Sequence, residues 1–243
     1  MKRRSPWWGE HRSRYYWAAE VIAGKSALDV GCGTGYGLYI LCDGGAESAT
    51  GVDYDPTAIG GIDEIRSEGI GFCAGDATRL PLKEEAFDVV TSFEVLEHLE
   101  RADEYLSEVD RVLKSDGTFL VSTPNALVTM PIGGRPKNPY HVHEYQPVEL
   151  TDLLQRHFGS VTVMGQTVMD SFGFCPLWSG EGRSNQRVRA ALWETIDHLV
   201  PYGVKDRIAR LRHNRGFYPG EYDFDFGSNV TLQAHVLVAS CRK

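Results

Sequence analysis

Residues 28–35 read LDVGCGTG, a short apolar run that passes directly into a turn with glycine at every second position. A backbone comes close to a ligand only where side chains are absent, and Gly31, Gly33 and Gly35 remove them from this turn. A helix that follows would point its N-terminal amides at the same place. The pattern indicates a nucleotide-like ligand, although a tight strand-to-helix turn without a ligand favours glycine as well. The turn alone leaves both interpretations open.

Acidic residues mark the ends of the next two strand-like runs. Asp53 ends the run at 49–53, about 20 residues after the glycine turn, where a carboxylate can accept hydrogen bonds from two ribose hydroxyls. Asp76 and Ala77 follow the run at 70–74. The turn lacks the GxGxxG spacing of dinucleotide-binding proteins, so no grip on a pyrophosphate is predicted.

Strand-like and helix-like runs alternate through the first half of the chain. The strands are expected at 27–30, 49–53, 70–74, 87–92 and 118–122, and the helices at 35–42, 56–66 and 102–113. Such alternation predicts an α/β fold whose parallel strands are joined by right-handed crossovers. Further strands are expected at 161–163 and 229–240, and further helices at 188–199 and 204–211.

Composition narrows the class of protein. With 243 residues the chain can bury a substantial core as one domain. A net charge of -8 disfavours a general nucleic-acid binder, because phosphate neutralisation calls for a basic surface. No long apolar run and no signal-peptide core are present, so we expect a cytoplasmic protein without a membrane partner. The five unclustered cysteines predict neither a disulfide framework nor a zinc site.

Five motifs occur in one order from residue 28 onward: LDVGCGTG, the acidic Asp53, GDATRLPL, FDVVTSFEVLEHL and RVLKSDGTFLVSTPN. Together they resemble the class I S-adenosylmethionine-dependent methyltransferases, of the type 11/12 group. The resemblance implies an enzyme with a Rossmann-like fold. Its sheet would have seven mostly parallel strands, with an antiparallel last strand beside the fifth and helices on both faces.

The same resemblance assigns residues to the parts of S-adenosylmethionine. The amino-acid part would meet Asp29, Gly31, Cys32, Gly33 and Gly35; the ribose Asp53, with Tyr54 beside it; the adenine Asp76 and Ala77; and the sulfonium side Phe93 and Glu94. Cys32 is interpreted as a small packing residue of that turn rather than as a nucleophile.

A metal hypothesis rests on the segment FEVLEHL. Its spacings of three and four residues place Glu94, Glu97 and His98 on one face of a helical turn, a mixed ligand set that suits Mg²⁺ or Mn²⁺. Such an ion lowers the pKa of a substrate hydroxyl and orients it. His141, in the loop NPYHVHEY after the fifth strand, would complete a four-ligand site. The alternative is a polar helix start that bonds backbone groups, because metal-independent methyltransferases carry a similar EHL segment.

Two further resemblances concern this site. The ExxEH pattern followed by His141 is similar to the metal site of the small-RNA 3′-terminal 2′-O-methyltransferases, and ExxEH alone to that of the ubiquinone-biosynthesis O-methyltransferases. The NPYHVHEY loop resembles one in bacterial methyltransferases that act on sugars. His143 is the predicted general base, acting with His141 and Glu97, because an imidazole accepts a proton near neutral pH. The alternative is a histidine that caps the helix starting at Pro147.

We expect one domain, made of an N-terminal helical cap at 1–25, a cofactor-binding core at 26–169, an insertion at 170–227 and a final strand at 228–243. The insertion would lie over the ligand as a substrate lid. A surface excursion or a dimer-forming element stays open as the alternative.

The sequence therefore predicts an S-adenosylmethionine-dependent O-methyltransferase, assisted by Mg²⁺, that acts on a small hydroxylated acceptor such as a saccharide. Three alternatives stay open. The first is a metal-independent N- or C-methyltransferase, the second an RNA 2′-O-methyltransferase, which the acidic balance disfavours, and the third a cofactor-binding protein without catalysis.

Overall fold

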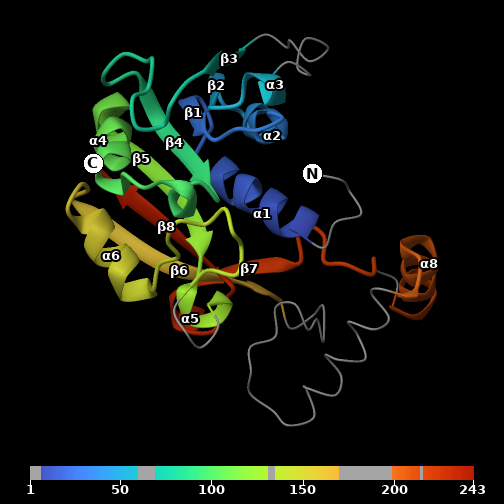
Figure 1. Ribbon diagram of the computed structural model, residues 1–243. Helices are drawn as coiled ribbons and strands as arrows, with labels where there is room; N and C mark the ends of the chain where they lie inside the picture. Colours follow the sequence, from blue (N-terminus) through green and yellow to red (C-terminus); the bar gives the residue numbers. More distant parts are fainter. Residues whose placement is uncertain (1–6, 60–68, 131–134, 170–198, 214–215) are drawn as a thin grey trace.

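The computed structural model describes residues 7–59, 69–130, 135–169, 199–213 and 216–243 (Figure 1). Its strands form one sheet in the order β3-β2-β1-β4-β5-β8-β6-β7. The strands are β1 Ser26–Val30, β2 Ser48–Asp53, β3 Ile70–Ala74, β4 Phe87–Phe93, β5 Leu113–Pro124, β6 Ser160–Val168, β7 Phe224–Gly227 and β8 Val236–Arg242. Strands β1 to β5 pair in parallel, which confirms the predicted α/β architecture.

The remaining strands pair antiparallel, β8 with β5 and β6, and β7 with β6. The expected insertion of the last strand beside the fifth is therefore confirmed. The expected number of strands is wrong, because the sheet has eight strands and not seven. The additional strand, β7, is an edge strand of four residues within the segment that we interpreted as an insertion. Four residues are too few for an alternating pattern to stand out in a sequence.

The last strand also begins later than the predicted 229–240. Ser228–Val230 form the 3₁₀ helix η4, and β8 starts only at Val236. The Asn125 amide donates hydrogen bonds to the carbonyls of Thr231 and Ala234, which holds this segment in a turn. The alternating apolar residues before β8 therefore do not extend the ladder.

Helices cover both faces of the sheet, as expected. They are α1 Trp7–Ala19, α2 Tyr36–Asp43, α3 Pro56–Ile59, η2 Leu96–His98, α4 Ala102–Val112, α5 Ala126–Thr129, α6 Pro147–Gln155 and α8 Tyr202–His213. The predicted helices at 35–42, 102–113 and 204–211 correspond to α2, α4 and α8. Of the helix predicted at 56–66, only the part in α3 is described, and the helix predicted at 188–199 lies almost wholly outside the described residues.

Two apolar clusters form the core, one on each face of the sheet. Alternate residues of the central strands divide between them: Leu28 and Val90 pack with α4 and α6, whereas Ala27 and Val89 pack with α1 and α2. Strands buried on both faces are a property of parallel sheets covered by helices. Figure 1 shows α4 and α6 on one side of the sheet and α1 and α2 on the other.

In the described part of the chain, no helix combines the length and the apolarity that a bilayer crossing needs. The cytoplasmic location stays a prediction.

Candidate active site

The glycine turn follows β1 at the carboxyl edge of the sheet. All three of its alternating glycines have positive φ, 78° at Gly31, 51° at Gly33 and 73° at Gly35, which side chains other than glycine rarely adopt. A Cβ at Gly31 would overlap the side chain of Val95. A Cβ at Gly33 would meet no atom within 4 Å, so the backbone there borders open space. The turn therefore has the geometry expected where backbone approaches a ligand.

Asp53, at the end of β2, holds this turn. Its Oδ2 accepts the Gly33 amide at 2.7 Å and its Oδ1 accepts the Asp55 amide at 3.0 Å. Each carboxylate oxygen keeps a second lone pair for another donor. The arrangement suits the predicted ribose contact, which stays a prediction. Tyr54 follows and is 82% exposed.

Asp29 is fully buried rather than open at the edge. Its Oδ2 accepts the Tyr15 hydroxyl at 2.9 Å and its Oδ1 accepts the Thr91 hydroxyl at 2.8 Å. Burial raises the pKa of Asp29 to about 7, although both hydrogen bonds oppose the rise. Tyr15 of α1 and Thr91 of β4 thus each donate a hydrogen bond to one oxygen of Asp29, and a direct contact of Asp29 with the cofactor stays a prediction.

Cys32 packs beneath the turn. It is 2% exposed, and a Cβ at Gly51 of β2 would come within 2.6 Å of its Sγ. Burial also raises the pKa of the Cys32 thiol, which leaves it protonated. These observations agree with a packing residue.

Asp76 lies past the end of β3 and is half-exposed. Its Oδ1 accepts both the amide and the hydroxyl of Thr78 at 2.8 Å, and these bonds lower the pKa of Asp76. Ala77 packs against the core cluster that contains α4. The predicted adenine contacts of Asp76 and Ala77 are compatible with this position and stay predictions.

Glu94 directly follows β4 and has an unusual backbone. Its φ is 60°, a value that non-glycine residues adopt mainly where the surroundings enforce it. Its Oε1 accepts the Ser122 hydroxyl at 2.8 Å and forms an ion pair with the Arg14 guanidinium at 3.1 Å. Burial alone would raise the pKa of Glu94, but the charge of Arg14 leads the opposing effects, and the pKa lies below its ordinary value. The neighbouring Phe93 ring contacts Tyr15 edge-on, with centroids 5.0 Å apart.

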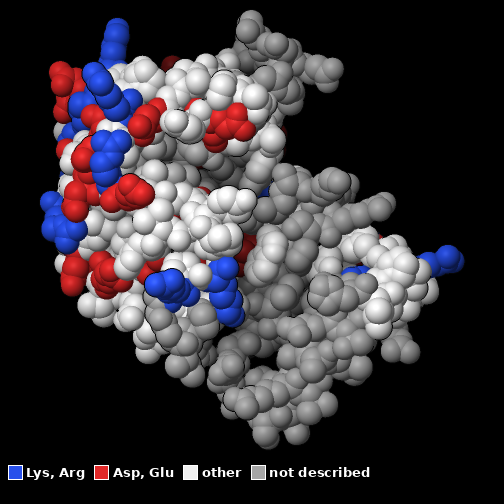
Figure 2. Space-filling view, viewed as in Figure 1, with Lys and Arg blue, Asp and Glu red and all other residues white. Residues whose placement is uncertain are grey.

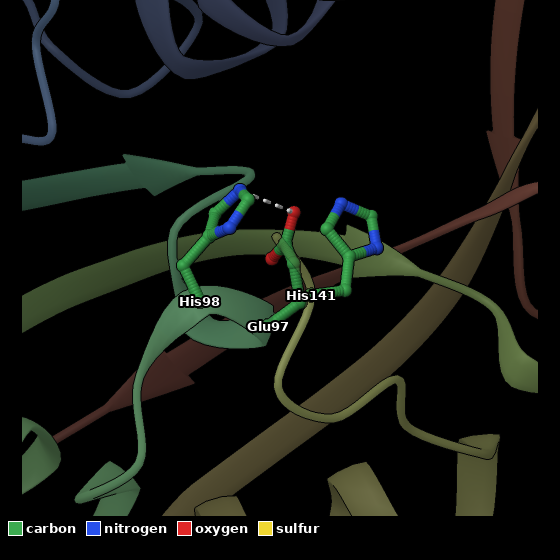
Figure 3. A group of neighbouring side chains, drawn as sticks. All are labelled: Glu97, His98 and His141. Carbon is green, nitrogen blue, oxygen red and sulfur yellow. Dashed lines mark ion pairs between the residues drawn. The ribbon is translucent and has the colours of Figure 1, made fainter. Parts of the chain in front are cut away.

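Glu97, His98 and His141 form a compact group at the same edge, with one potential ligand atom of each within 4.8 Å of the others. Figure 3 shows the carboxylate of Glu97 between the two imidazole rings. Glu97 is fully buried, and its Oε2 accepts the Thr123 hydroxyl at 3.2 Å. Its Oε1 has no hydrogen-bond donor and lies 3.9 Å from Nε2 of His98. A buried carboxylate oxygen without a donor is uncommon and points to an absent partner.

Both histidines are oriented through their other ring nitrogen. Nδ1 of His98 lies 2.9 Å from the Tyr140 carbonyl, which can only accept, so Nδ1 carries the proton. Nδ1 of His141 lies 2.6 Å from Oε1 of the buried Glu144. Metal-binding histidines are held in this way, by a carbonyl or a carboxylate behind the ring. Nε2 of His141 currently faces the amide of Asn138 at 2.8 Å. With an unpaired carboxylate oxygen between two such rings, the donor set fits a divalent cation.

Two predicted members lie outside this group. Glu94 is paired with Arg14 and Ser122 instead, so the structure brings together three of the four predicted ligands. The predicted base, His143, has its Nε2 2.6 Å from Oε1 of Glu149 in the first turn of α6, and both side chains are half-exposed. Glu149 also accepts the backbone amide of Gln146 at the start of α6, so His143 contacts the side chain of a capping residue and does not itself cap the helix. The ligand role of Glu94 and the base role of His143 stay predictions.

Arg14 was not predicted from the sequence, and it is among the largest fully buried side chains of the described residues. Its Nε donates to Oε1 of Gln166 on β6 at 2.7 Å, and its NH1 donates to Ser122 at 3.3 Å. A third contact joins its NH2 to Oε2 of Glu10 at 3.2 Å. An arginine four residues after a glutamate reads as an exposed helical pair, so no sequence signal distinguishes this one.

The described part of the predicted lid packs against α1. The Trp17 ring stacks on Phe226 with centroids 5.3 Å apart, and Tyr16 contacts Tyr222 at 5.1 Å. Arg12 forms an ion pair with Glu221 at 3.3 Å. These aromatic residues therefore contact the N-terminal helix, and the lid interpretation stays a prediction. Residues 170–198 of the expected insertion lie outside the described residues.

Comparison with known proteins identifies the domain. A model of a methyltransferase domain family matches residues 28–121. A probable S-adenosylmethionine-dependent methyltransferase of Mycolicibacterium smegmatis is 38% identical over 149 residues, which are 61% of this chain and 57% of that protein. Residues 28–121 carry an S-adenosylmethionine-dependent methyltransferase domain. The resemblance drawn from the five motifs is thereby confirmed, and S-adenosylmethionine is supported as the cofactor.

Two further proteins are similar to this chain. A fatty-acid O-methyltransferase of Mycolicibacterium smegmatis is 34% identical over 111 residues, 41% of this chain and 37% of that protein. The crystal structure of a methyltransferase from Archaeoglobus fulgidus has a TM-score of 0.60 at 19% identity and covers 97% of this chain and 92% of that one. The structural match shows the fold. The chain spans little more than half the length of the first of these sequence relatives.

Proposed function

We propose that this protein transfers the methyl group of S-adenosylmethionine to a hydroxyl of a small acceptor, and that Glu97, His98 and His141 hold a divalent cation, Mg²⁺ or Mn²⁺, beside that hydroxyl. The observation that carries the proposal is the buried Oε1 of Glu97, which has no hydrogen-bond donor. The carboxylate lies between the imidazole rings of His98 and His141, and each ring is held by a hydrogen bond at its Nδ1. The methyltransferase domain also supports the proposal, because its glycine turn lies at the same edge of the sheet as Glu97, His98 and His141.

The chemistry of the reaction follows from the donor and the acceptor. The bond between sulfur and the methyl carbon breaks, a bond from the acceptor oxygen to that carbon forms, and the sulfonium becomes a neutral thioether. A cation bound by the group would lower the pKa of the acceptor hydroxyl. The hydroxyl proton must then pass to a base. His143 is the proposed base, with Glu149 holding its Nε2 so that Nδ1 accepts the proton.

Two features support a small acceptor such as a saccharide. Tyr140, next to His141 in the loop before α6, exposes 78% of its surface and offers a flat ring on which a sugar can stack. On the face shown in Figure 2, the described Lys and Arg side chains alternate with Asp and Glu over the side of α4 and α6, and they form no continuous basic area there. An RNA substrate would call for such an area. The name of one relative, a fatty-acid O-methyltransferase, supports transfer to oxygen.

The test is turnover with a labelled methyl group. The purified protein is incubated with S-adenosylmethionine carrying a labelled methyl and with fractions of hydroxylated metabolites, before EDTA, after EDTA and after the return of Mg²⁺. We expect the rate to fall with EDTA and to recover with Mg²⁺. Glu97→Gln, which would remove a charged ligand, should lower the rate by at least about 10-fold, the smaller loss typical when only a partner behind a ligand is changed. The matched control is Glu104→Gln. Glu104 is an exposed glutamate on α4 that forms an ion pair with Arg101, the residue before the helix.

The outcomes separate the alternatives. Turnover that is unaffected by EDTA and by Glu97→Gln contradicts the metal hypothesis and favours a metal-independent N- or C-methyltransferase. Methylation of RNA but of no small acceptor contradicts the acceptor class. Binding of S-adenosylmethionine without turnover across the panel supports a cofactor-binding protein without catalysis.

A further inference from the structure

Helix α1 carries a buried arginine that reaches the methyl-donor side of the domain. Figure 1 shows α1 beside the carboxyl end of β4. The guanidinium of Arg14 is fully buried there and contacts three elements at once: Gln166 on β6, Ser122 on β5 and Glu94 after β4. A planar guanidinium can make these contacts together because its donors are fixed in a fork. Glu10, one turn earlier on α1, pairs with the remaining arm.

The partners of Arg14 are themselves fixed. The Gln166 amide donates to the Glu10 carbonyl at 2.9 Å and to the Ser13 hydroxyl at 2.7 Å, so its oxygen is directed at Arg14. Gln166 is fully buried as well. The network therefore ties β6 to α1 and sets the orientation of the guanidinium before any ligand binds.

Glu94 is the residue on which these restraints converge. Its backbone has a φ of 60°, and its amide donates to both the carbonyl and the hydroxyl of Ser122 at 3.2 Å. Its Oε1 is held by Ser122 and by Arg14. A strained backbone persists only where its neighbours determine it, and such residues cluster at functional sites. The end of β4 is also where the sulfonium of the cofactor is expected.

We propose that Arg14 is a positioning residue of the cofactor site, which fixes the carboxylate of Glu94 so that it faces the positive sulfonium of S-adenosylmethionine. The inference rests on the methyltransferase domain and not on the proposed acceptor or cation. S-adenosylhomocysteine has the same skeleton without the methyl group and without the positive charge. A carboxylate that faces the sulfonium therefore favours S-adenosylmethionine over S-adenosylhomocysteine, and a misplaced one loses that preference.

The experiment measures the dissociation constants of both ligands by calorimetry, without acceptor and without metal. The variant Arg14→Lys keeps the charge but loses the fork. We expect it to weaken S-adenosylmethionine about tenfold and S-adenosylhomocysteine about threefold or less. Glu94→Gln should reduce the same preference, and Arg14→Lys added to it should reduce the preference little further, because Arg14 acts through Glu94.

The experiment includes two further variants, a control and a substitute for Arg14→Lys. Arg111→Lys alters another forked arginine, which holds Glu108 and the carbonyls of Leu80 and Leu82 beneath α4. It should leave the ratio of the two dissociation constants unchanged. If Arg14→Lys does not fold, Ser122→Ala removes a single hydroxyl from the same network and should shift the ratio in the same direction.

Equal weakening of both ligands in Arg14→Lys would assign Arg14 to folding alone and overturn the proposal. An unchanged ratio in both Ser122→Ala and Glu94→Gln would overturn it as well. Because no acceptor is present, failure of the proposed methylation reaction does not affect these outcomes.

Discussion

Replacing Asp29 by asparagine tests whether this carboxyl is buried in the way the structure shows. Burial raises the pKa of Asp29 from its ordinary value of 3.8 to about 7. The folded state therefore binds this proton more tightly than the unfolded state does. The contribution of Asp29 to stability is complete below pH 3.8 and is lost as the pH rises through 7. At 1.36 kcal/mol per pKa unit, the total loss is about 4 kcal/mol, of which about 2–3 kcal/mol falls between pH 5 and pH 8.

The pKa of His11, a partly buried side chain, is shifted in the opposite direction. Burial, aided by the charge of Arg14, lowers the pKa of His11 from 6.5 to about 4. The folded state binds the His11 proton less tightly, so that contribution is lost as the pH falls from 6.5 to 4. Below neutral pH, the contributions of Asp29 and His11 to the free energy of unfolding therefore change in opposite directions with pH. The pH profile of the parent protein alone cannot isolate the contribution of Asp29.

Because His11 is present in both proteins, its contribution cancels when the parent is compared with Asp29→Asn. Urea denaturation at pH 5, 6, 7 and 8 gives the free energy of unfolding of each protein. We expect the parent's free energy of unfolding, relative to that of the variant, to fall by about 2–3 kcal/mol from pH 5 to pH 8. A difference that does not change with pH would refute the burial of an ionisable Asp29 beneath Tyr15.

Three further predictions concern single positions. Gly37→Ala would place a Cβ in the Tyr15 ring and should lower stability by about 1–3 kcal/mol in urea denaturation, whereas Gly203→Ala on α8, with open space around it, should not. Asp53→Ala should weaken S-adenosylmethionine by about 1–3 kcal/mol in calorimetry, and an unchanged dissociation constant would refute the ribose contact. His143→Ala should reduce kcat by about 10²-fold or more, and a full rate would leave His143 only as a structural partner of Glu149.

The parallel half of the sheet was predictable because each strand ends at a polar or glycine-rich motif. Apolar runs such as 87–92 are buried on both faces, and their pattern does not depend on distant partners. The antiparallel half was less predictable. Strand β7 has four residues, and the segment before β8 is held by Asn125, which lies about a hundred residues earlier in the chain. Such contacts leave no local trace in the sequence.

The candidate site was likewise predictable only in part. The spacing within FEVLEHL placed Glu97 and His98 correctly beside each other, and the loop histidine His141 joins them in the structure. The spacing could not show that Glu94 turns toward Arg14, because that pairing depends on how α1 packs against the sheet. Charge partners from distant elements decide which carboxylates stay available for a ligand.

The binding of Mn²⁺ tests the central claim most directly. Pulsed electron paramagnetic resonance of the protein with S-adenosylmethionine and Mn²⁺ detects coupling of the metal to imidazole nitrogen. We predict one bound Mn²⁺ with coupling to two histidines, and the loss of one coupling in His98→Ala and in His141→Ala. Absence of Mn²⁺ binding, or bound Mn²⁺ without nitrogen coupling, would contradict a metal site formed by Glu97, His98 and His141.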